Sequence, residues 1–409
     1  MQNASRFIVV AGISSGCLSM LYFLSLVLHA PFFIAVFIIF VAVFLFSRWV
    51  TKGNENFKPI KTELTAWAYI LLVSGVILMV QSSYSPAPKH GDWDAWAFWN
   101  LHAKYLADPL NWQKLFRNNL GDHPDYPLLV PGTNAFFIRL LGGNADTIVP
   151  FIFSFSIMLF IPVLVYLETA RENIVIAAIV LLLFIQDTHY LSIGLAQYAD
   201  LPLAFFFLCA LVCMNHIDEN KTNVVLIAAS LGCSMWAKNE GIILSAIFIL
   251  FNMRTLFSRR NARYFILGLS FPLMVLFVFK IFYAPQNDIL SGQNSDTFNQ
   301  LFMASRYETI YNYFSAQLDG KFYYVKIAFF SYATLCIIEK KWPGKQMLML
   351  IACMVAYMMV YILSVQALEW HLATSIDRLM LQLMPAMMYI ISLKFSEVQF
   401  SLPKKTLTK

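Results

Sequence analysis

The chain has 409 residues, of which 59% are hydrophobic and only 13% are charged, and its mean hydropathy is +0.64. These values exclude a soluble domain, which could not bury so much apolar surface, and they indicate an all-α polytopic membrane protein. The formal net charge of +6 is accounted for by basic clusters beside apolar segments, so we expect membrane lipids and no nucleic acid as partners.

Apolar segments recur along the whole chain, and about twelve can be drawn near the length of roughly 20 residues that a bilayer requires. The predicted spans are 7–28, 31–47, 64–82, 147–167, 174–186, 201–216, 224–237, 241–253, 264–284, 325–338, 346–367 and 379–394. They divide the chain into an N-terminal hairpin and loop (1–63), a core (64–260) with the long loop 83–146, and a C-terminal region (261–409) with the loop 285–324.

Lysine and arginine gather at four places along the chain, namely 48–61, 254–263, 340–345 and 404–409. With twelve spans all four fall on one side, which the positive-inside rule makes cytoplasmic. The loops that face outward are then 83–146, 187–200, 238–240, 285–324 and 368–378. The sequence therefore predicts a multi-pass protein, for which we expect a bacterial inner membrane and an active site that faces the periplasm.

An acidic pair, Asp92 and Asp94, lies among tryptophans directly after the third predicted span. Carboxylates at the edge of a membrane are more often functional than those on an ordinary surface. The alternative for Asp94 is a structural one, because Asp is a good N-cap for the helix that should follow. Capping does not explain Asp92, and we interpret at least one of the pair as catalytic or metal-binding.

The segment after the acidic pair has the pattern of a helix in the membrane interface. Trp93, Trp96, Trp99, Ala103 and Leu106 fall along one helical stripe, as in an amphipathic helix whose apolar face lies among lipids. The same helix should carry two polar candidates for contact with a substrate, His102 and Lys104.

A proline-bearing segment, 121–129, follows in the same loop. Its prolines disallow a helix and hold the chain extended. The side chains of His123, Asp125 and Tyr126 are thus presented from a rigid backbone that can line a cleft. Solvated histidines are the alternative, since the spacing matches no standard metal site.

Two shorter outward connections carry charge. Asp200 stands immediately before an apolar span with Pro202 in its first turn, where an N-cap is the competing explanation. Lys238 and Glu240 lie in a hairpin between two apolar segments. A lysine there runs against the topological bias, so either a substrate contact or an ion pair with Glu240 is expected.

The last candidates are His371 and Arg378, at the outer end of the final predicted span. Arg378 could hold an anion or anchor the helix at the headgroup level. The polar segment around 286–318 is interpreted as a lid, and no chemistry is assigned to it.

This inventory suits one kind of reaction at the outer face. Transfer of a sugar from a polyprenyl-phosphate carrier needs a base to take the proton of the acceptor hydroxyl and cations to hold the departing phosphate. A general acid is not needed, because phosphate is a good leaving group. Displacement from the opposite face of the sugar inverts the anomeric centre.

Together these motifs resemble the GT-C integral-membrane glycosyltransferases, and the branch that looks closest is the protein O-mannosyltransferase and lipid A aminoarabinose transferase group. The resemblance covers roughly 64–260 by pattern and the rest more loosely. It implies a GT-C-like bundle of about 12 transmembrane helices, with interfacial helices in the first long outer loop. The chain departs from the pattern in an extra hairpin, 1–47, and in Tyr126-Pro127 where close relatives place Lys-Pro-Pro.

The resemblance also implies roles for individual residues. The family's proposed base maps onto Asp92 or Asp94, and its carboxylate before a later span maps onto Asp200. The carrier phosphate would be held by basic residues of the outer face, for which the candidates are Lys104, His123, Lys238 and Arg378. The full predicted site comprises Asp92, Asp94 and Asp200 as catalytic residues and His102, Lys104, His123, Asp125, Tyr126, Lys238, Glu240, His371 and Arg378 as substrate-binding residues.

The predicted function is therefore an inverting glycosyltransferase that uses a polyprenyl-phosphate-linked donor and a glycan, lipid or protein acceptor. The sequence assigns no cofactor, and the acidic pair with Asp200 leaves open whether a divalent cation or none is bound. A lipid-linked glycan polymerase or ligase would use similar outer-loop residues. A secondary transporter would also have about twelve spans, but it should carry ionisable residues or broken helices near the bilayer midplane.

Overall fold

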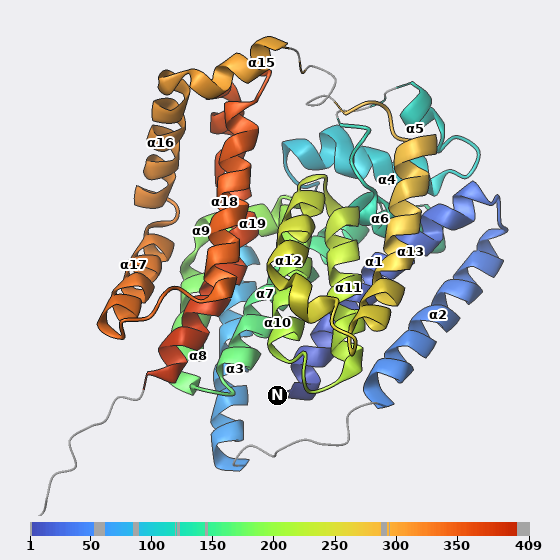
Figure 1. Ribbon diagram of the computed structural model, residues 1–409. Coiled ribbons are helices and arrows are strands. Elements are labelled where there is room, and N and C mark those ends of the chain that lie inside the picture. The colour runs from blue at the N-terminus through green and yellow to red at the C-terminus, as the bar shows by residue number, and fades with distance from the viewer. Residues whose placement is uncertain are drawn as a thin grey trace, which may run out of the picture.

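The computed structural model describes residues 2–52, 62–84, 90–118, 120, 123–143, 146–287, 293 and 295–398. All regular structure in these ranges is helical, and none of it is strand (Figure 1). Residues 121–122 of the proline-bearing segment, Lys58 and Lys61, and the basic residues at 404–409 lie outside the described residues.

The helices follow one another with short connections. They are α1 (Gln2–Val27), α2 (Phe32–Lys52), α3 (Thr62–Tyr84), η1 (Ala95–Trp99), α4 (Asn100–Ala107), α5 (Lys114–Arg117), α6 (Leu129–Leu140), α7 (Ile148–Thr169), α8 (Ile174–Gln186), α9 (Thr188–Leu195), α10 (Asp200–Asn215), α11 (Lys221–Ala237), α12 (Glu240–Leu256), α13 (Ala262–Phe282), α15 (Ser295–Asn299), η2 (Gln300–Phe302), α16 (Ala304–Asp319), α17 (Tyr323–Ile338), α18 (Lys345–Ile362) and α19 (Leu368–Glu397).

Seven of the described helices are long and apolar enough to cross a membrane, namely α1, α2, α3, α7, α13, α18 and α19. Two bent pairs, α8 with α9 at 63° and α16 with α17 at 96°, raise the number to nine if each pair is one span. A helical multi-pass membrane protein is thus confirmed. The predicted count of twelve needs α10, α11 and α12 as well, and these have only 16, 17 and 17 residues, so that count stays a prediction.

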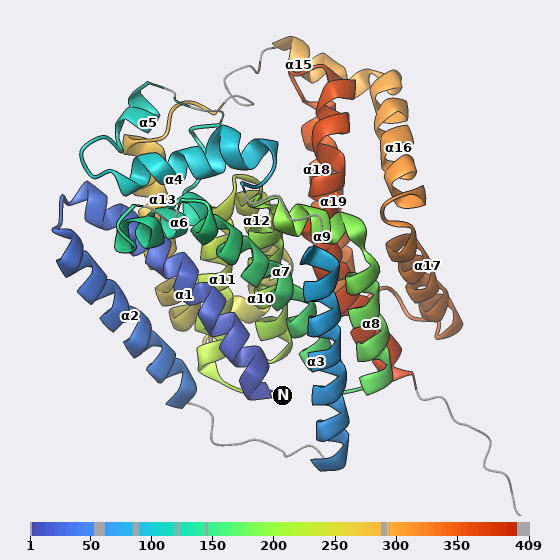
Figure 2. The same ribbon diagram turned by 180° about the vertical axis from the view of Figure 1, so that it is seen from behind.

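The core is built around α10, whose residues are buried from Asp200 to Met214. It packs against α7, α11 and α19. Its side chains are apolar on every face of the helix, as expected of a helix inside a bundle. At the periphery, α2 keeps Phe33, Phe37 and Phe44 between 60% and 74% exposed. Such a face suits contact with lipid tails, and Figure 2 shows α2 on the flank of the bundle beside α1.

The segment after Asp94 differs from the predicted interfacial helix. Its first turn is η1, a π-helix, and only then does α4 begin. A π-turn bonds each residue to the fifth one along, so it rotates the tryptophan stripe partway round the helix. Trp93 and Trp96 remain more than half exposed, whereas Trp99 is buried inside the protein. The apolar face of α4 packs against α6, at the end of the bundle opposite the N-terminus (Figure 1).

A polar cluster lies at the C-terminal end of α10, opposite Asp200, and the sequence did not predict it. His216 bonds through Nε2 to Glu168 at 2.7 Å and through Nδ1 to Glu219 at 2.8 Å. Arg171 contacts Glu168 at 3.2 Å, and the side chain of Arg6 borders the same small cavity of about 40 Å³. These residues come from three segments that are far apart in the sequence, so no single local pattern predicts that they meet. They tie α1, α7 and α10 together.

This cluster predicts that stability falls as the pH rises. Burial alone would lower the pKa of His216, but the hydrogen bond to Glu168 and its charge outweigh burial and raise that pKa above 6.5. The folded state therefore binds this proton more tightly than the unfolded chain, and its stabilising effect is complete below 6.5 and lost as the pH rises through the folded-state pKa. We expect thermal unfolding in detergent to show a falling melting temperature above pH 6.5 that is flattened in His216→Gln. Parallel curves for both proteins would contradict this.

Candidate functional site

Three carboxylates and two cations from four parts of the chain meet near the α4 end of the bundle. They are Asp94, Asp200, Glu240, Lys238 and Arg378, which we call the ionic cluster. The sequence placed them in four separate outward loops. Their convergence is what a shared site requires.

Asp200 is the buried centre of the ionic cluster, with 1% of its side chain exposed. The residue is the first of α10, whose N-cap is Ala199, so the competing explanation of Asp200 as an N-cap is wrong. Its carboxylate instead accepts hydrogen bonds from Lys238 Nζ at 3.0 Å and from Gln382 Nε2 at 2.6 Å. Arg378 Nη1 lies 4.0 Å away.

Lys238 lies in the extended connection between α11 and α12 and is buried. Its ammonium stands 3.0 Å from both Asp200 Oδ1 and Glu240 Oε1. Burial alone would lower the pKa of Lys238, but the charges of Asp200 and Glu240 more than offset it and raise that pKa. Lys238 is therefore a fixed cation, and the ion pair with Glu240 that the sequence left as an alternative is present.

Asp94 and Arg378 form the outer part of the ionic cluster. Asp94 precedes η1 but makes no capping hydrogen bond, so capping does not account for it either. Its carboxylate forms an ion pair with Arg378 Nη1, and the two side chains are 17% and 19% exposed. The guanidinium lies over the ring of Tyr198 at 5.2 Å. Solvent thus reaches this pair and not Asp200.

One backbone and one side-chain hydrogen bond hold the first loop against the segment before α10. The amide N–H of Asp92 donates to the carbonyl of Ala196 at 3.1 Å, and Asn100 donates to Gln197 at 2.8 Å. Gly91 has a φ of +73°, and a Cβ there would lie 2.8 Å from the Ala196 carbonyl oxygen. Only glycine therefore lets the two segments approach so closely. This contact places Asp94 beside Tyr198 and Arg378.

The proline-bearing segment lies next to the ionic cluster and is not helical at 123–128. Asp125 is buried and accepts hydrogen bonds from Asn239 at 2.8 Å and Asn287 at 2.7 Å. His123 stacks on Tyr126 with ring centroids 4.8 Å apart. Lys238 lies 5.8 Å from the centre of the Tyr126 ring, so this segment forms one wall of the cluster.

Other predicted site residues lie outside the ionic cluster. Asp92 is exposed and accepts a hydrogen bond from the N–H of Trp93 at 2.8 Å. Lys104 is exposed and pairs with Asp146 at 2.9 Å. His102 is fully buried, and burial together with the charge of His123 lowers its pKa to about 3. It is therefore neutral at ordinary pH and supplies no cation. His371 bonds to Ser364 at 2.8 Å.

The sequence analysis missed three polar residues that support the cluster. Gln382 stands one helical turn after Arg378 on α19, and it accepts a hydrogen bond from the hydroxyl of Tyr357 at 2.5 Å. Lys280, near the end of α13, donates to the carbonyl of Asp125 at 2.6 Å. A polar amide or a lysine inside an apolar span is the signal that could have found the first and the last of these.

The comparisons with known proteins give no family. The chain matches no protein-family model, no curated protein and no solved structure. The resemblance to GT-C enzymes therefore rests on the sequence motifs alone. Among the described residues, no three His, Cys, Asp or Glu side chains come together in a way that could hold a metal ion.

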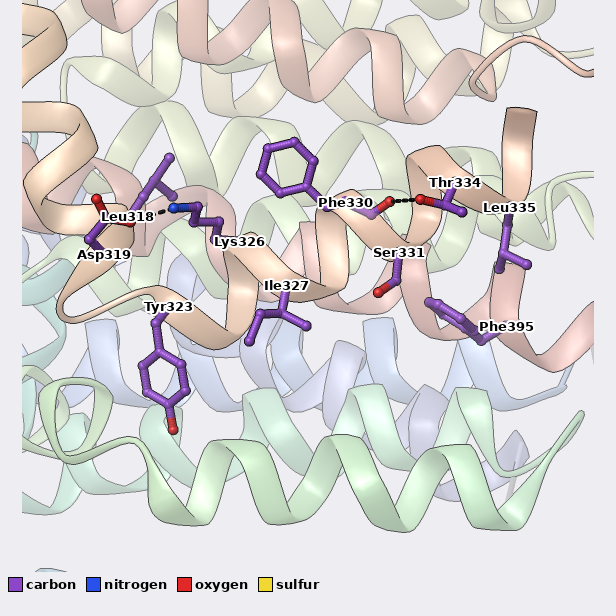
Figure 3. Close-up of a pocket in the computed structure, with 10 residues that line it drawn as sticks. All are labelled: Leu318, Asp319, Tyr323, Lys326, Ile327, Phe330, Ser331, Thr334, Leu335 and Phe395. Carbon is purple, nitrogen blue, oxygen red and sulfur yellow. Dashed lines mark hydrogen bonds and ion pairs between the residues drawn. The ribbon is translucent and has the colours of Figure 1, made fainter. Parts of the chain in front are cut away.

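A cavity of about 600 Å³ lies along α17 (Figure 3). Its lining includes Tyr323, Ile327 and Phe330 on one face of α17, together with Phe395 from α19. A polar pair, Asp319 and Lys326, stands at one end. None of the lining residues belongs to the ionic cluster, so this cavity is separate from the candidate site.

The ionic cluster combines a solvent-accessible carboxylate with an adjacent guanidinium, backed by a buried lysine. A carboxylate can accept a proton and a guanidinium can stabilise an oxyanion. Both functions are available within one ion pair, because Asp94 and Arg378 touch each other at the edge of the cluster.

Proposed function

We propose that the protein is a membrane glycosyltransferase that moves a sugar from a polyprenyl-phosphate donor to an acceptor hydroxyl with inversion. The observation that carries the proposal is the ion pair between Asp94 and Arg378 at the accessible edge of a buried ionic cluster. It sets a base beside a phosphate-binding group, which is the pair of functions that this reaction needs.

In the proposed reaction Asp94 takes the proton of the acceptor hydroxyl as the acceptor oxygen bonds to the anomeric carbon. The bond from that carbon to the phosphate oxygen breaks at the same time, and polyprenyl phosphate leaves with the electron pair. Arg378 stabilises the charge on the departing phosphate. Lys238 pairs with both Asp200 and Glu240, and Asp200 helps to hold Arg378 in place.

A secondary transporter is the second candidate. The two bent helix pairs and the buried pair of Asp200 with Lys238 are features that such proteins carry. Against it, Asp200 is the first residue of α10 and Lys238 lies between two helices, so these charges are at helix ends. A lipid-linked glycan polymerase or ligase would use the same accessible pair and differs in its acceptor.

The test of the function is a comparison of surface glycans and glycolipids by mass spectrometry, with and without the protein. We expect one glycan or lipid to lose a single sugar when the protein is absent. Membranes carrying the protein should then restore that sugar from a polyprenyl-phosphate-linked donor. Unchanged glycans and glycolipids, together with movement of a solute across vesicles, would favour the transporter.

A further inference from the structure

We propose that Arg378 is the site for the donor phosphate and that Asp94 occupies this site in the resting protein. Binding of the phosphate then displaces the Asp94 carboxylate and frees it to act as the base. The inference rests on the proposed function for the identity of the ligand. It adds that the base becomes available only when the donor has arrived.

The Asp94 carboxylate is held loosely enough at Arg378 for another anion to replace it. Within the described part of the chain, Arg378 is the one hydrogen-bonding partner of its carboxylate. The side chain is 17% exposed, and it makes no capping bond to η1. Among the described residues, the guanidinium alone therefore holds the carboxylate in place, and water can replace that contact.

Asp200, the other carboxylate beside Arg378, has the opposite properties. It is 1% exposed and is held by Lys238 at 3.0 Å and by Gln382 at 2.6 Å. Displacing it would leave Lys238 with one carboxylate fewer in a buried environment, which is costly. An incoming anion at Arg378 therefore competes with Asp94 and leaves Asp200 where it is.

The chemistry of the guanidinium and the net charge of the cluster both favour replacement of Asp94 by the incoming phosphate. A guanidinium presents the same fork of N–H donors to a carboxylate and to a phosphate, so either can take the same place. With three carboxylates and two cations, the ionic cluster already has a net charge of −1. A second anion added beside Asp94 would be repelled, whereas one that replaces Asp94 would not.

The test measures how tightly the full chain in detergent binds inorganic phosphate and farnesyl phosphate. Binding is measured by the shift in melting temperature as each ligand is added. Removing the charge of the resident carboxylate should strengthen binding, so we expect Asp94→Asn to bind both ligands about tenfold more tightly than the wild type. Arg378→Gln should bind neither, and Arg378→Lys should bind weakly because it lacks the fork.

Asp218→Asn is the matched control, because Asp218 is highly exposed and pairs with Arg260 elsewhere. It should bind phosphate as the wild type does. Each variant is compared with its own melting temperature without ligand, and Asp94→Ser serves if Asp94→Asn does not fold. Equal or weaker phosphate binding in the Asp94 variants would overturn the inference.

Sugar transfer by the wild type separates this inference from the proposed function. Tighter phosphate binding in Asp94→Asn, combined with no transfer from any polyprenyl-phosphate donor, would keep the exchange at Arg378 and overturn the glycosyltransferase. Transfer by the wild type, combined with unchanged phosphate binding in Asp94→Asn, would keep the enzyme and overturn the exchange.

Discussion

Asp94→Asn is expected to lower the rate of sugar transfer by a factor of about 10² to 10⁴, the usual contribution of a positioned general base. The amide has the size of the carboxylate but cannot take the acceptor's proton. Because Asp94 is partly exposed and caps no helix, the variant should still fold and reach the membrane. Initial rates at saturating donor, with expression measured in the same membranes, would show the loss.

The same experiment decides which member of the acidic pair is the base, a choice that the sequence left open. Asp92 faces solvent, and its carboxylate contacts the neighbouring N–H of Trp93. We expect Asp92→Asn to lose much less activity than Asp94→Asn, and Asp218→Asn to lose none. A larger loss of activity in Asp92→Asn would identify Asp92 as the general base. Full activity in Asp94→Asn would remove the mechanism.

Lys238→Met is expected to destabilise the protein by about 3–5 kcal/mol, the cost of breaking a buried ion pair by removing one partner. Lys238 is 7% exposed and neutralises both Asp200 and Glu240. Without the ammonium, two carboxylates face each other in a site that water reaches poorly. Thermal or denaturant unfolding in detergent would measure the loss.

A second set of variants separates charge from packing. In Lys238→Met combined with Asp200→Asn and Glu240→Gln, no uncompensated charge remains at these positions, so much of the lost stability should return. Lys114→Met, at an exposed lysine on α5, should change stability by less than about 0.5 kcal/mol. A triple variant as unstable as Lys238→Met alone would show that the methylene chain matters more than the charge.

Hydropathy was enough to predict a helical membrane protein, because apolar segments of membrane length have few other uses. It also located Lys238 and Glu240 in one hairpin, where ion pairing follows from proximity in the chain. The number of spans is harder to predict, since α10, α11 and α12 are short and two pairs of helices, α8 with α9 and α16 with α17, are bent where they join. Hydropathy reports the length of a segment and says nothing about a break within it.

The contacts within the site could not be predicted from the sequence alone. That charged outer loops would meet could be proposed, but which of them touch depends on how helices pack. Asp200 was a catalytic candidate with an N-cap as the competing explanation, and it is the buried centre of the ionic cluster, because α10 and α19 bring Gln382 against it. His102 was a candidate for contact with a substrate and is instead a fully buried residue of α4, which packs against α6. Both results depend on tertiary contacts that no local pattern records.

The apolar length of α10 has an electrical consequence. Below Asp200 the helix carries only apolar side chains and cysteines as far as Met214, and all of them are buried. A proton or ion that reaches the charged end finds no polar stepping stone along this helix, since ions in hydrocarbon surroundings are strongly disfavoured. Buried apolar side chains along α10 thus separate the ionic cluster from the polar cluster at the other end of this helix.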